Sequence, residues 1–131
     1  MAGACAGLKV LEISRGMAGS LAGMILADHG ADVIRAESPS GDPYLSIAGE
    51  RTWSRGKRRI ALDLDVAGER ESALPLARKA DIVLCGVRPT TAERWGLSYE
   101  ALPAHNPRVI FATISGFGWT GPYRDFPVVE G

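Results

Sequence analysis

The chain has 131 residues, of which 46% are hydrophobic and 23% charged, the profile of a globular domain rather than of a disordered, collagenous or membrane chain. Its 15 basic and 15 acidic residues cancel, which excludes the whole-molecule positive field of a non-specific nucleic-acid or membrane-surface binder. The two cysteines form no CxxC and the two histidines are isolated, so no metal-ligand spacing can be assembled.

The N-terminus and the hydropathy profile bear on location. Residues 1–7 are small and uncharged, so they lack the basic region and long apolar stretch of a secretory signal. No window approaches the roughly 18 apolar residues that mark a membrane-spanning helix. We therefore expect a reduced, cytoplasmic protein without a metal, which binds neither nucleic acid nor a membrane.

The chain opens with a predicted strand, helix and strand. Residues 8–13 (LKVLEI) are an apolar run, and residues 14–16 (SRG) follow like a strand-to-helix turn. Apolar residues recur at helical spacing over residues 17–29, with Gly30 where a left-handed C-cap is expected. Residues 31–37 (ADVIRAE) read as a second strand.

A long loop and three more elements follow. Residues 38–49 contain two prolines and two glycines among polar residues, which predicts a surface loop. Residues 59–64 (RIALDL) alternate like a third strand, residues 67–80 are a predicted helix, and residues 81–85 (DIVLC) are a fourth strand. Pro75 removes a backbone hydrogen bond inside that helix, so we expect a later start or a bend.

The last predicted elements complete an α/β pattern. Short helices at residues 91–95 and 99–104 are split by Gly96, and residues 108–115 (RVIFATIS) are a β-branched fifth strand before a final loop. Apolar strands that alternate with helices predict a Rossmann-like, mostly parallel sheet with helices on both faces. No linker or repeat divides residues 1–131, so a single domain is expected.

Five segments along the chain show a family resemblance. They are VLEISRGMAG at residues 10–19, GADVIRAESPSGDP at 30–43, SRGKRRIALDLD at 54–65, ADIVLCGVRPTTAERWGLSYEAL at 80–102 and HNPRVIFATISGFGWTGPY at 105–123. In order and spacing they resemble the family III CoA transferases, which include carnitine CoA-transferases, formyl-CoA transferases and α-methylacyl-CoA racemases.

The resemblance implies a coenzyme A-binding, Rossmann-like domain and an interlocked homodimer. It also implies acyl-CoA and a carboxylic acid acceptor as substrates, with no tightly bound cofactor. In the transferases a carboxylate attacks the thioester and becomes an anhydride, then an aspartyl-CoA thioester, before CoA passes to the acceptor. Family chains are longer and that aspartate lies beyond residue 131. We therefore expect a truncated N-terminal part, inactive alone and self-associating through uncovered apolar faces.

Two candidate anion sites lie early in the chain. The run SRGKRR at residues 54–59 places cations before a strand; by composition it reads as a solvated loop, whereas the resemblance implies CoA contacts from Lys57 and Arg58. The turn before the first helix can present backbone N–H groups to an anion or a thioester oxygen. By resemblance Arg15 and Met17 contact the ligand there.

A third candidate lies at the carboxyl end of the fourth strand, the edge where open parallel sheets bind ligands. By resemblance the residues that contact CoA there are Leu62, Gly86, Val87, Arg88 and Arg94. Many relatives carry an asparagine and an aromatic residue at the positions of Gly86 and Val87, so this chain departs from the family pattern there. For Arg88 an ordinary surface arginine is an equal alternative.

Glu130 resembles the glutamate that supports the nucleophile of the transferases. An exposed acid in the first turn of a helix is the alternative. In racemase relatives the preceding residue is a catalytic histidine, and here it is Val129, which counts against a racemase fragment.

Two further alternatives come from the same stretch of sequence. Residues 116–121 spell GxGxxG after a strand, the dinucleotide pattern. Two prolines follow, and no helix is predicted at the third glycine, so a glycine loop near the active site is favoured over a nicotinamide site. A non-catalytic module that binds CoA or a partner is the last alternative.

Overall fold

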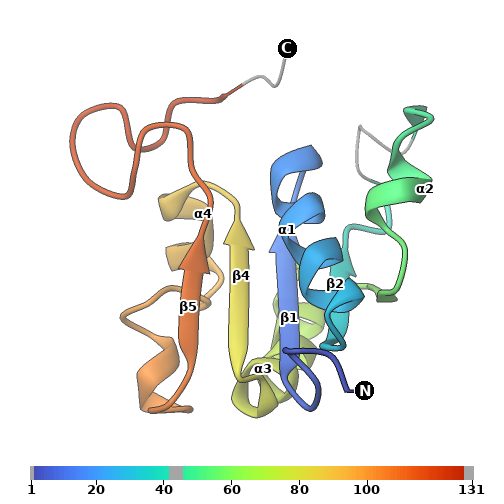
Figure 1. Ribbon diagram of the computed structural model, residues 1–131. Helices are drawn as coiled ribbons and strands as arrows, with labels where there is room; N and C mark the ends of the chain where they lie inside the picture. Colours follow the sequence, from blue (N-terminus) through green and yellow to red (C-terminus); the bar gives the residue numbers. More distant parts are fainter. Residues whose placement is uncertain (1, 42–45, 129–131) are drawn as a thin grey trace.

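The computed structural model describes residues 2–41 and 46–128. They form a parallel five-stranded sheet with the strand order β3-β2-β1-β4-β5 (Figure 1). The strands are β1 (Lys9–Ser14), β2 (Asp32–Glu37), β3 (Arg58–Ala61), β4 (Ile82–Gly86) and β5 (Ile110–Thr113). Because all are parallel, their carboxyl ends share one edge of the sheet, the upper edge in Figure 1.

The strand order reverses beside β1. From β1 the chain proceeds to β2 and β3 on one side, and then crosses to β4 and β5 on the other. The register pairs Ser14, the last residue of β1, with Gly86, the last residue of β4. Open α/β sheets bind ligands outside the carboxyl ends of their strands at such a switch point. The topology therefore predicts a ligand site at the ends of β1 and β4.

Helices cover both faces of the sheet. The helices are α1 (Met17–Asp28) and α2 (Glu50–Trp53) on one face, and α3 (Ala67–Lys79) and α4 (Pro89–Arg94) on the other. Successive residues of β1 point to opposite faces, as the period of a strand requires. Val10 accordingly packs in the hydrophobic cluster under α1, whereas Leu11 packs in the larger cluster under α3 and α4.

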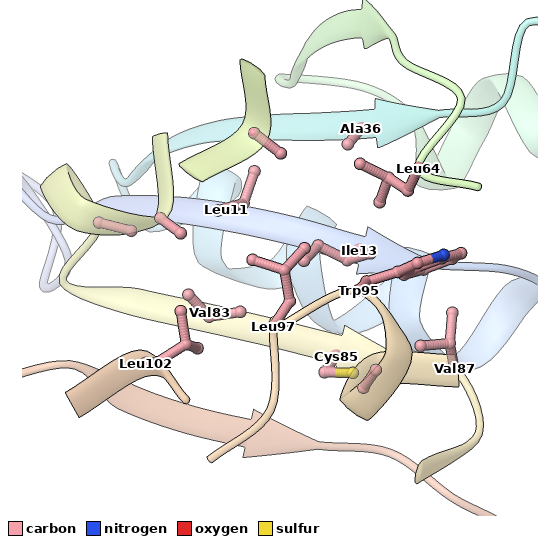
Figure 2. Close-up of a cluster of buried hydrophobic side chains, with 14 of the residues drawn as sticks. Leu11, Ile13, Ala36, Leu64, Val83, Cys85, Val87, Trp95, Leu97 and Leu102 are labelled. Carbon is pink, nitrogen blue, oxygen red and sulfur yellow. The ribbon is translucent and has the colours of Figure 1, made fainter. Parts of the chain in front are cut away.

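The larger hydrophobic cluster forms the main core (Figure 2). Leu11 and Val83 from the central strands are buried there, and the α3 residues Ala73 and Ala77 face them. Small side chains at these two positions let α3 lie close to the sheet. Trp95, which follows α4, lies at the arrowhead end of β1 in Figure 2. The core thus extends to the edge where the strands end.

The predicted fold class is confirmed, and two element boundaries differ. β3 ends at Ala61, although the alternation predicted a strand to residue 64; Leu62 and Leu64 are nevertheless buried in the main core. α3 begins at Ala67 and continues through Pro75, so the later start is wrong. Pro75 lies on the exposed face of this helix.

Three other segments also differ from the predictions. The helix predicted over residues 99–104 is a single 3-10 turn, Leu102–Ala104, and the fifth strand is limited to the four residues of β5. Pro103 lies in the first positions of this turn, where the N–H that proline lacks would have no partner within the turn, so it favours a new turn there. α2 had no local signal, because its four residues are held by tertiary contacts with α1.

Within residues 2–41 and 46–128 no helix has the length and apolar character needed to cross a membrane. In the same residues no three histidine, cysteine, aspartate or glutamate side chains gather closely enough to hold a metal ion.

Candidate functional site

A cleft of about 360 Å³ opens at the carboxyl ends of β1 and β4. We call it the switch-point cleft. The predicted CoA contacts that line it are Arg15, Gly86, Val87 and Arg88. Its opposite wall is the loop after β5, including Arg124 and Phe126. The topology therefore brings together residues from the turn after β1 and from the segment between β4 and α4.

A narrow pocket of about 30 Å³ adjoins the cleft. Leu62 and Trp95 line it, together with Arg15 and Val87, which also line the cleft. The two hollows therefore meet at Arg15 and Val87. Since a water molecule needs roughly 10–15 Å³ on this measure, the narrow pocket admits only a very small group. It can serve as the floor under a larger ligand, but it cannot enclose one.

Arg94 lies near this floor and already has an anionic partner. Its Nη2 donates to Asp65 Oδ1 at 2.5 Å, and Trp95 Nε1 donates to the same oxygen at 2.9 Å. The hydrogen bond from Trp95 holds the pKa of Asp65 below its ordinary value, and the positive charges of Arg94 and Arg15 act in the same direction. The Arg15 guanidinium lies over the Trp95 ring, 6.0 Å from its centroid.

Gly86 allows β1 and β4 to end close to α1. A Cβ at residue 86 would lie 2.9 Å from the Cβ of Ser14, and one at Gly19 would lie 2.3 Å from the same atom. Real Cβ atoms do not approach so closely, so both glycines permit the packing of the first turn of α1 on the strand ends. A larger residue at position 86 would therefore require Ser14 or the end of a strand to shift.

The loop after β5 is fixed to α4 by polar contacts. Arg124 donates to both oxygens of Glu93, at 3.1 and 3.2 Å, while the Asp125 carboxylate accepts from the backbone and hydroxyl of Thr90. The hydroxyl of Thr90 lowers the pKa of Asp125. In the described part no helix opens at Gly121, whose φ is 88°. The segment is a glycine loop at the cleft, without the helix of a dinucleotide fingerprint.

Arg88 and Met17 complete the residues near this edge. Arg88 is exposed in the wall of the cleft and forms no ion pair with any carboxylate in the described part of the chain. Met17 is the first residue of α1 and is 37% exposed. The start of α1 thus lies beside the cleft, although Met17 is not part of its lining.

Lys57 and Arg58 are not brought to the cleft, despite their predicted contact with CoA. Lys57 is buried, and its Nζ donates to Glu12 Oε2 at 2.6 Å and to the Ser20 carbonyl at 2.7 Å. Arg58 begins β3 at the opposite, amino-terminal edge and makes a bidentate pair with Asp32. In this structure both cations serve ion pairs away from the switch point.

Burial governs the ionisation of two groups. Burial lowers the pKa of the Lys57 ammonium from its ordinary value, although the adjacent Glu12 carboxylate opposes this effect. Burial also raises the pKa of the Cys85 thiol to about 11. A thiol is nucleophilic only as its thiolate, and near neutral pH the Cys85 thiol stays protonated. Cys85 therefore serves as a buried core residue and not as a nucleophile. Glu130, the predicted supporting carboxylate, lies outside the described residues.

Sequence reasoning missed three polar side chains near this edge, Ser14, Asp65 and Arg124. Each lies beyond or at the end of a strand, which is the one local signal that could have singled them out. The partners of two of them come from distant segments: Asp65 is 29 residues from Arg94, and Arg124 is 31 residues from Glu93. No pattern in the sequence indicates these pairings.

The family model and the curated relatives point to one family. The model of CoA-transferase family III matches residues 5–130. The chain is 39% identical over 136 residues to the succinate–glutarate CoA-transferase of Agrobacterium fabrum, covering 92% of this chain and 34% of that protein. It is 41% identical over 128 residues to the succinyl-CoA–D-citramalate CoA-transferase of Chloroflexus aurantiacus, covering 90% of this chain and 32% of that protein.

A solved structure shows the same arrangement. The crystal structure of a CAIB/BAIF family protein from Brucella suis superposes with a TM-score of 0.88 at 37% identity, covering 96% of this chain and 37% of that chain. This chain therefore spans about a third of the length of the proteins that it matches.

Proposed function

Since the chain belongs to CoA-transferase family III, we propose that it forms the coenzyme A-binding part of an enzyme that moves CoA between carboxylic acids. The observation that carries the proposal is the meeting of the switch-point cleft and the narrow pocket at Arg15 and Val87. A ligand that is apolar in one part and polyanionic in another suits this surface, because buried apolar side chains there adjoin exposed arginines.

The proposed nucleotide site lies across the narrow pocket. Leu62 and Val87 are almost fully buried and offer apolar contact to adenosine. Arg15, Arg88 and Arg94 surround this contact with guanidinium groups, which pair well with phosphate oxygens. Arg88 has no carboxylate partner in the described residues, whereas Arg94 must exchange Asp65 for a phosphate. We therefore assign the phosphates of CoA to these three arginines.

The proposed acyl end of the ligand lies in the switch-point cleft, toward the start of α1. The start of a helix is the positive end of its dipole, so it favours an anion or a polarised thioester oxygen. Met17 begins this helix, and small residues at its first turn allow close approach. This assignment places Met17 beside the thioester as a contact residue and not as a reacting group.

The proposed reaction follows the course that the family resemblance implies. An aspartate carboxylate oxygen attacks the thioester carbonyl, and the carbon–sulfur bond breaks to give a mixed anhydride and CoA thiolate. The thiolate then attacks the aspartyl carbonyl of the anhydride, which releases the first acid and forms an aspartyl-CoA thioester. The acceptor carboxylate repeats the two steps in reverse and leaves with CoA. Glu130 is proposed to support the aspartate, and a homodimer is the proposed assembly.

The proposal is tested first by calorimetric titration of the protein with coenzyme A. We expect saturable binding, and Arg94→Ala should weaken it about tenfold, the usual effect of losing a charge-assisted hydrogen bond. Arg55→Ala is the matched control, because Arg55 is an exposed arginine that pairs with Asp28 on the far end of α1. Equal weakening by both substitutions would contradict the assigned site.

Two further measurements separate the alternatives. Tighter binding of a nicotinamide dinucleotide than of CoA would revive the dehydrogenase alternative. Turnover is then assayed with succinyl-CoA and glutarate, the substrates suggested by the names of the relatives. Transfer supports the proposed enzyme, whereas CoA binding without transfer in the intact protein would favour a non-catalytic module, and exchange of the α-proton of a branched acyl-CoA would favour a racemase.

A further inference from the structure

A group of charged side chains is buried between the sheet and the helices α1 and α2. Glu12 from β1 is fully buried, Arg35 from β2 is 1% exposed, and the side chain of Lys57 is fully buried. Lys57 Nζ is 2.6 Å from Glu12 Oε2. The opposite charges thus lie in contact inside the protein, where water does not screen them.

The second oxygen of Glu12 connects this pair to the start of α1. Ser14 Oγ donates to Glu12 Oε1 at 2.7 Å, and Ser20 Oγ lies 3.4 Å from the same oxygen. Lys57 Nζ also donates to the Ser20 carbonyl at 2.7 Å. One carboxylate therefore joins three segments: the end of β1, the first turns of α1, and the residue before β3.

The helix lies close over the ion pair because α1 has a glycine there. A Cβ at Gly23 would lie 2.0 Å from Glu12 Oε2 and 3.0 Å from Lys57 Nζ. No side chain other than hydrogen fits in this position without displacing the pair. The path of α1 and the geometry of the ion pair are thus mutually determined.

Stability alone does not explain why charges occupy this position. Removing two charges from water costs several kcal/mol per ion, and apolar residues of similar volume often stabilise a fold equally well or better. A hydrogen-bonded ion pair fixes the orientation of the groups that it contacts, because hydrogen bonds restrict angles that apolar contact leaves free. Here the groups so oriented are Ser14 and Ser20, on either side of the turn that contributes Arg15 to the cleft.

We propose that Glu12 and Lys57 are positioning residues, which hold the turn of Arg15 and Gly16 and the first turn of α1 in the geometry that receives the thioester end of CoA. The inference rests on the proposed function for the identity of the ligand. Neither side chain reaches the cleft, so both act through Ser14 and Ser20. The expected consequence of losing them is a loosened turn in a protein that remains folded.

The test compares two variants of the intact protein. Glu12→Leu combined with Lys57→Met removes both charges while keeping apolar volume, so it should retain the fold. Ser14→Ala breaks only the link between Glu12 and the end of β1. The matched control is Asp28→Asn with Arg55→Gln, because that exposed ion pair also joins α1 to the segment before β3, but at the far end of the helix.

Two readouts are taken from each variant. We expect the amides of residues 16–20 to exchange hydrogen about tenfold faster in the double variant, while those of β4 are unchanged, because local opening needs less free energy than global unfolding. CoA binding should weaken about tenfold, since a displaced contact group loses much of its effect. Ser14→Ala should also speed the exchange of these amides and weaken CoA binding, but by smaller factors. The control should change neither the exchange rates nor the affinity.

The outcomes separate the two proposals. Parent-like exchange at residues 16–20 together with parent-like CoA affinity in both variants would overturn the positioning role and leave a purely structural pair. If the parent protein is folded and binds no CoA, the proposed function fails, and the exchange rates alone decide whether the pair holds the turn. If the double variant does not fold, the exchange and affinity of Ser14→Ala decide it.

Discussion

At the residue scale, Asp65 forms an ion pair with Arg94, one of the predicted CoA contacts. The sequence predicts that Arg94 contacts CoA, and in the structure its guanidinium is held by the Asp65 carboxylate, which also accepts from Trp95. Both members of the ion pair are more than half exposed, so water screens their attraction and little stability depends on it. A phosphate can therefore compete for Arg94, but it meets the negative charge of Asp65.

We predict that Asp65→Asn tightens CoA binding. The substitution removes a negative charge beside the proposed phosphates and frees the Arg94 guanidinium, while an amide oxygen can still accept from Trp95. An increase of a few-fold is expected, about the size of an exposed charge interaction. Calorimetric titration at low and high salt measures it, and the gain should shrink as salt rises.

Asp28→Asn serves as the control for this prediction, since Asp28 forms a comparable exposed pair with Arg55 away from the cleft. Weaker CoA binding by Asp65→Asn than by the parent would show that Asp65 orients Arg94 for the ligand instead of competing with it.

At the scale of the element, α1 is fitted to its place by small residues. Gly19 faces Ser14, Gly23 faces the ion pair of Glu12 and Lys57, and Ser20 is fully buried between them. Gly23 lies four positions after Gly19 and three after Ser20, the spacing of one helix face. Their low helix propensity is offset by the close approach that they permit, which an isolated helix would not need.

We predict that Gly23→Ala destabilises the protein, although alanine favours an isolated helix over glycine by about 1 kcal/mol. The added Cβ would meet Glu12 Oε2 at 2.0 Å, so α1 or the ion pair must move. Overpacking of this kind costs about 1–3 kcal/mol. A lower midpoint in urea or thermal unfolding measures the effect.

Gly68→Ala is the control within α3, because apart from its chain neighbours and the backbone of its own helix no atom lies within 4 Å of the added Cβ. It should leave the midpoint unchanged or raise it. A Gly23→Ala variant as stable as Gly68→Ala would show that α1 can shift away from the ion pair at no cost.

At the scale of the whole molecule, the loop after β5 exposes a group of apolar side chains. Phe117, Tyr123 and Phe126 are 55%, 58% and 57% exposed, and the rings of Tyr123 and Phe126 pack edge to face at 5.3 Å. Val128 is similarly exposed. Contiguous exposed apolar surface of this kind is uncommon on monomers and favours association.

We therefore predict that the 131-residue chain self-associates. Sedimentation velocity over a range of concentrations should show species larger than a monomer, and Tyr123→Ser with Phe126→Ser should shift the distribution toward the monomer. Tyr99→Ser is the matched control, since Tyr99 is 61% exposed but lies outside this loop. A compact monomer of the parent at every concentration would contradict the prediction.

Local sequence patterns were enough to predict the fold class and the edge of the sheet at which a site forms. Apolar runs at residues 8–13, 31–37 and 81–85 predicted buried parallel strands, because such strands lie between two layers of helices. All three are confirmed as β1, β2 and β4 to within one residue at either end. Strand-to-helix turns after β1 and β4 pointed to the carboxyl edge, where the structure places Arg15, Gly86 and Val87 together.

Which cations are available at that edge depends on contacts between distant segments, which the folded chain reveals. Lys57 and Arg58 are adjacent in sequence, yet one is buried against Glu12, 45 residues away, and the other is paired with Asp32 at the opposite edge. Charge pairing and burial depend on what the folded chain brings alongside, whereas propensity and periodicity depend on near neighbours. The strands could thus be predicted from local patterns, and the roles of Lys57, Arg58 and Asp65 could not.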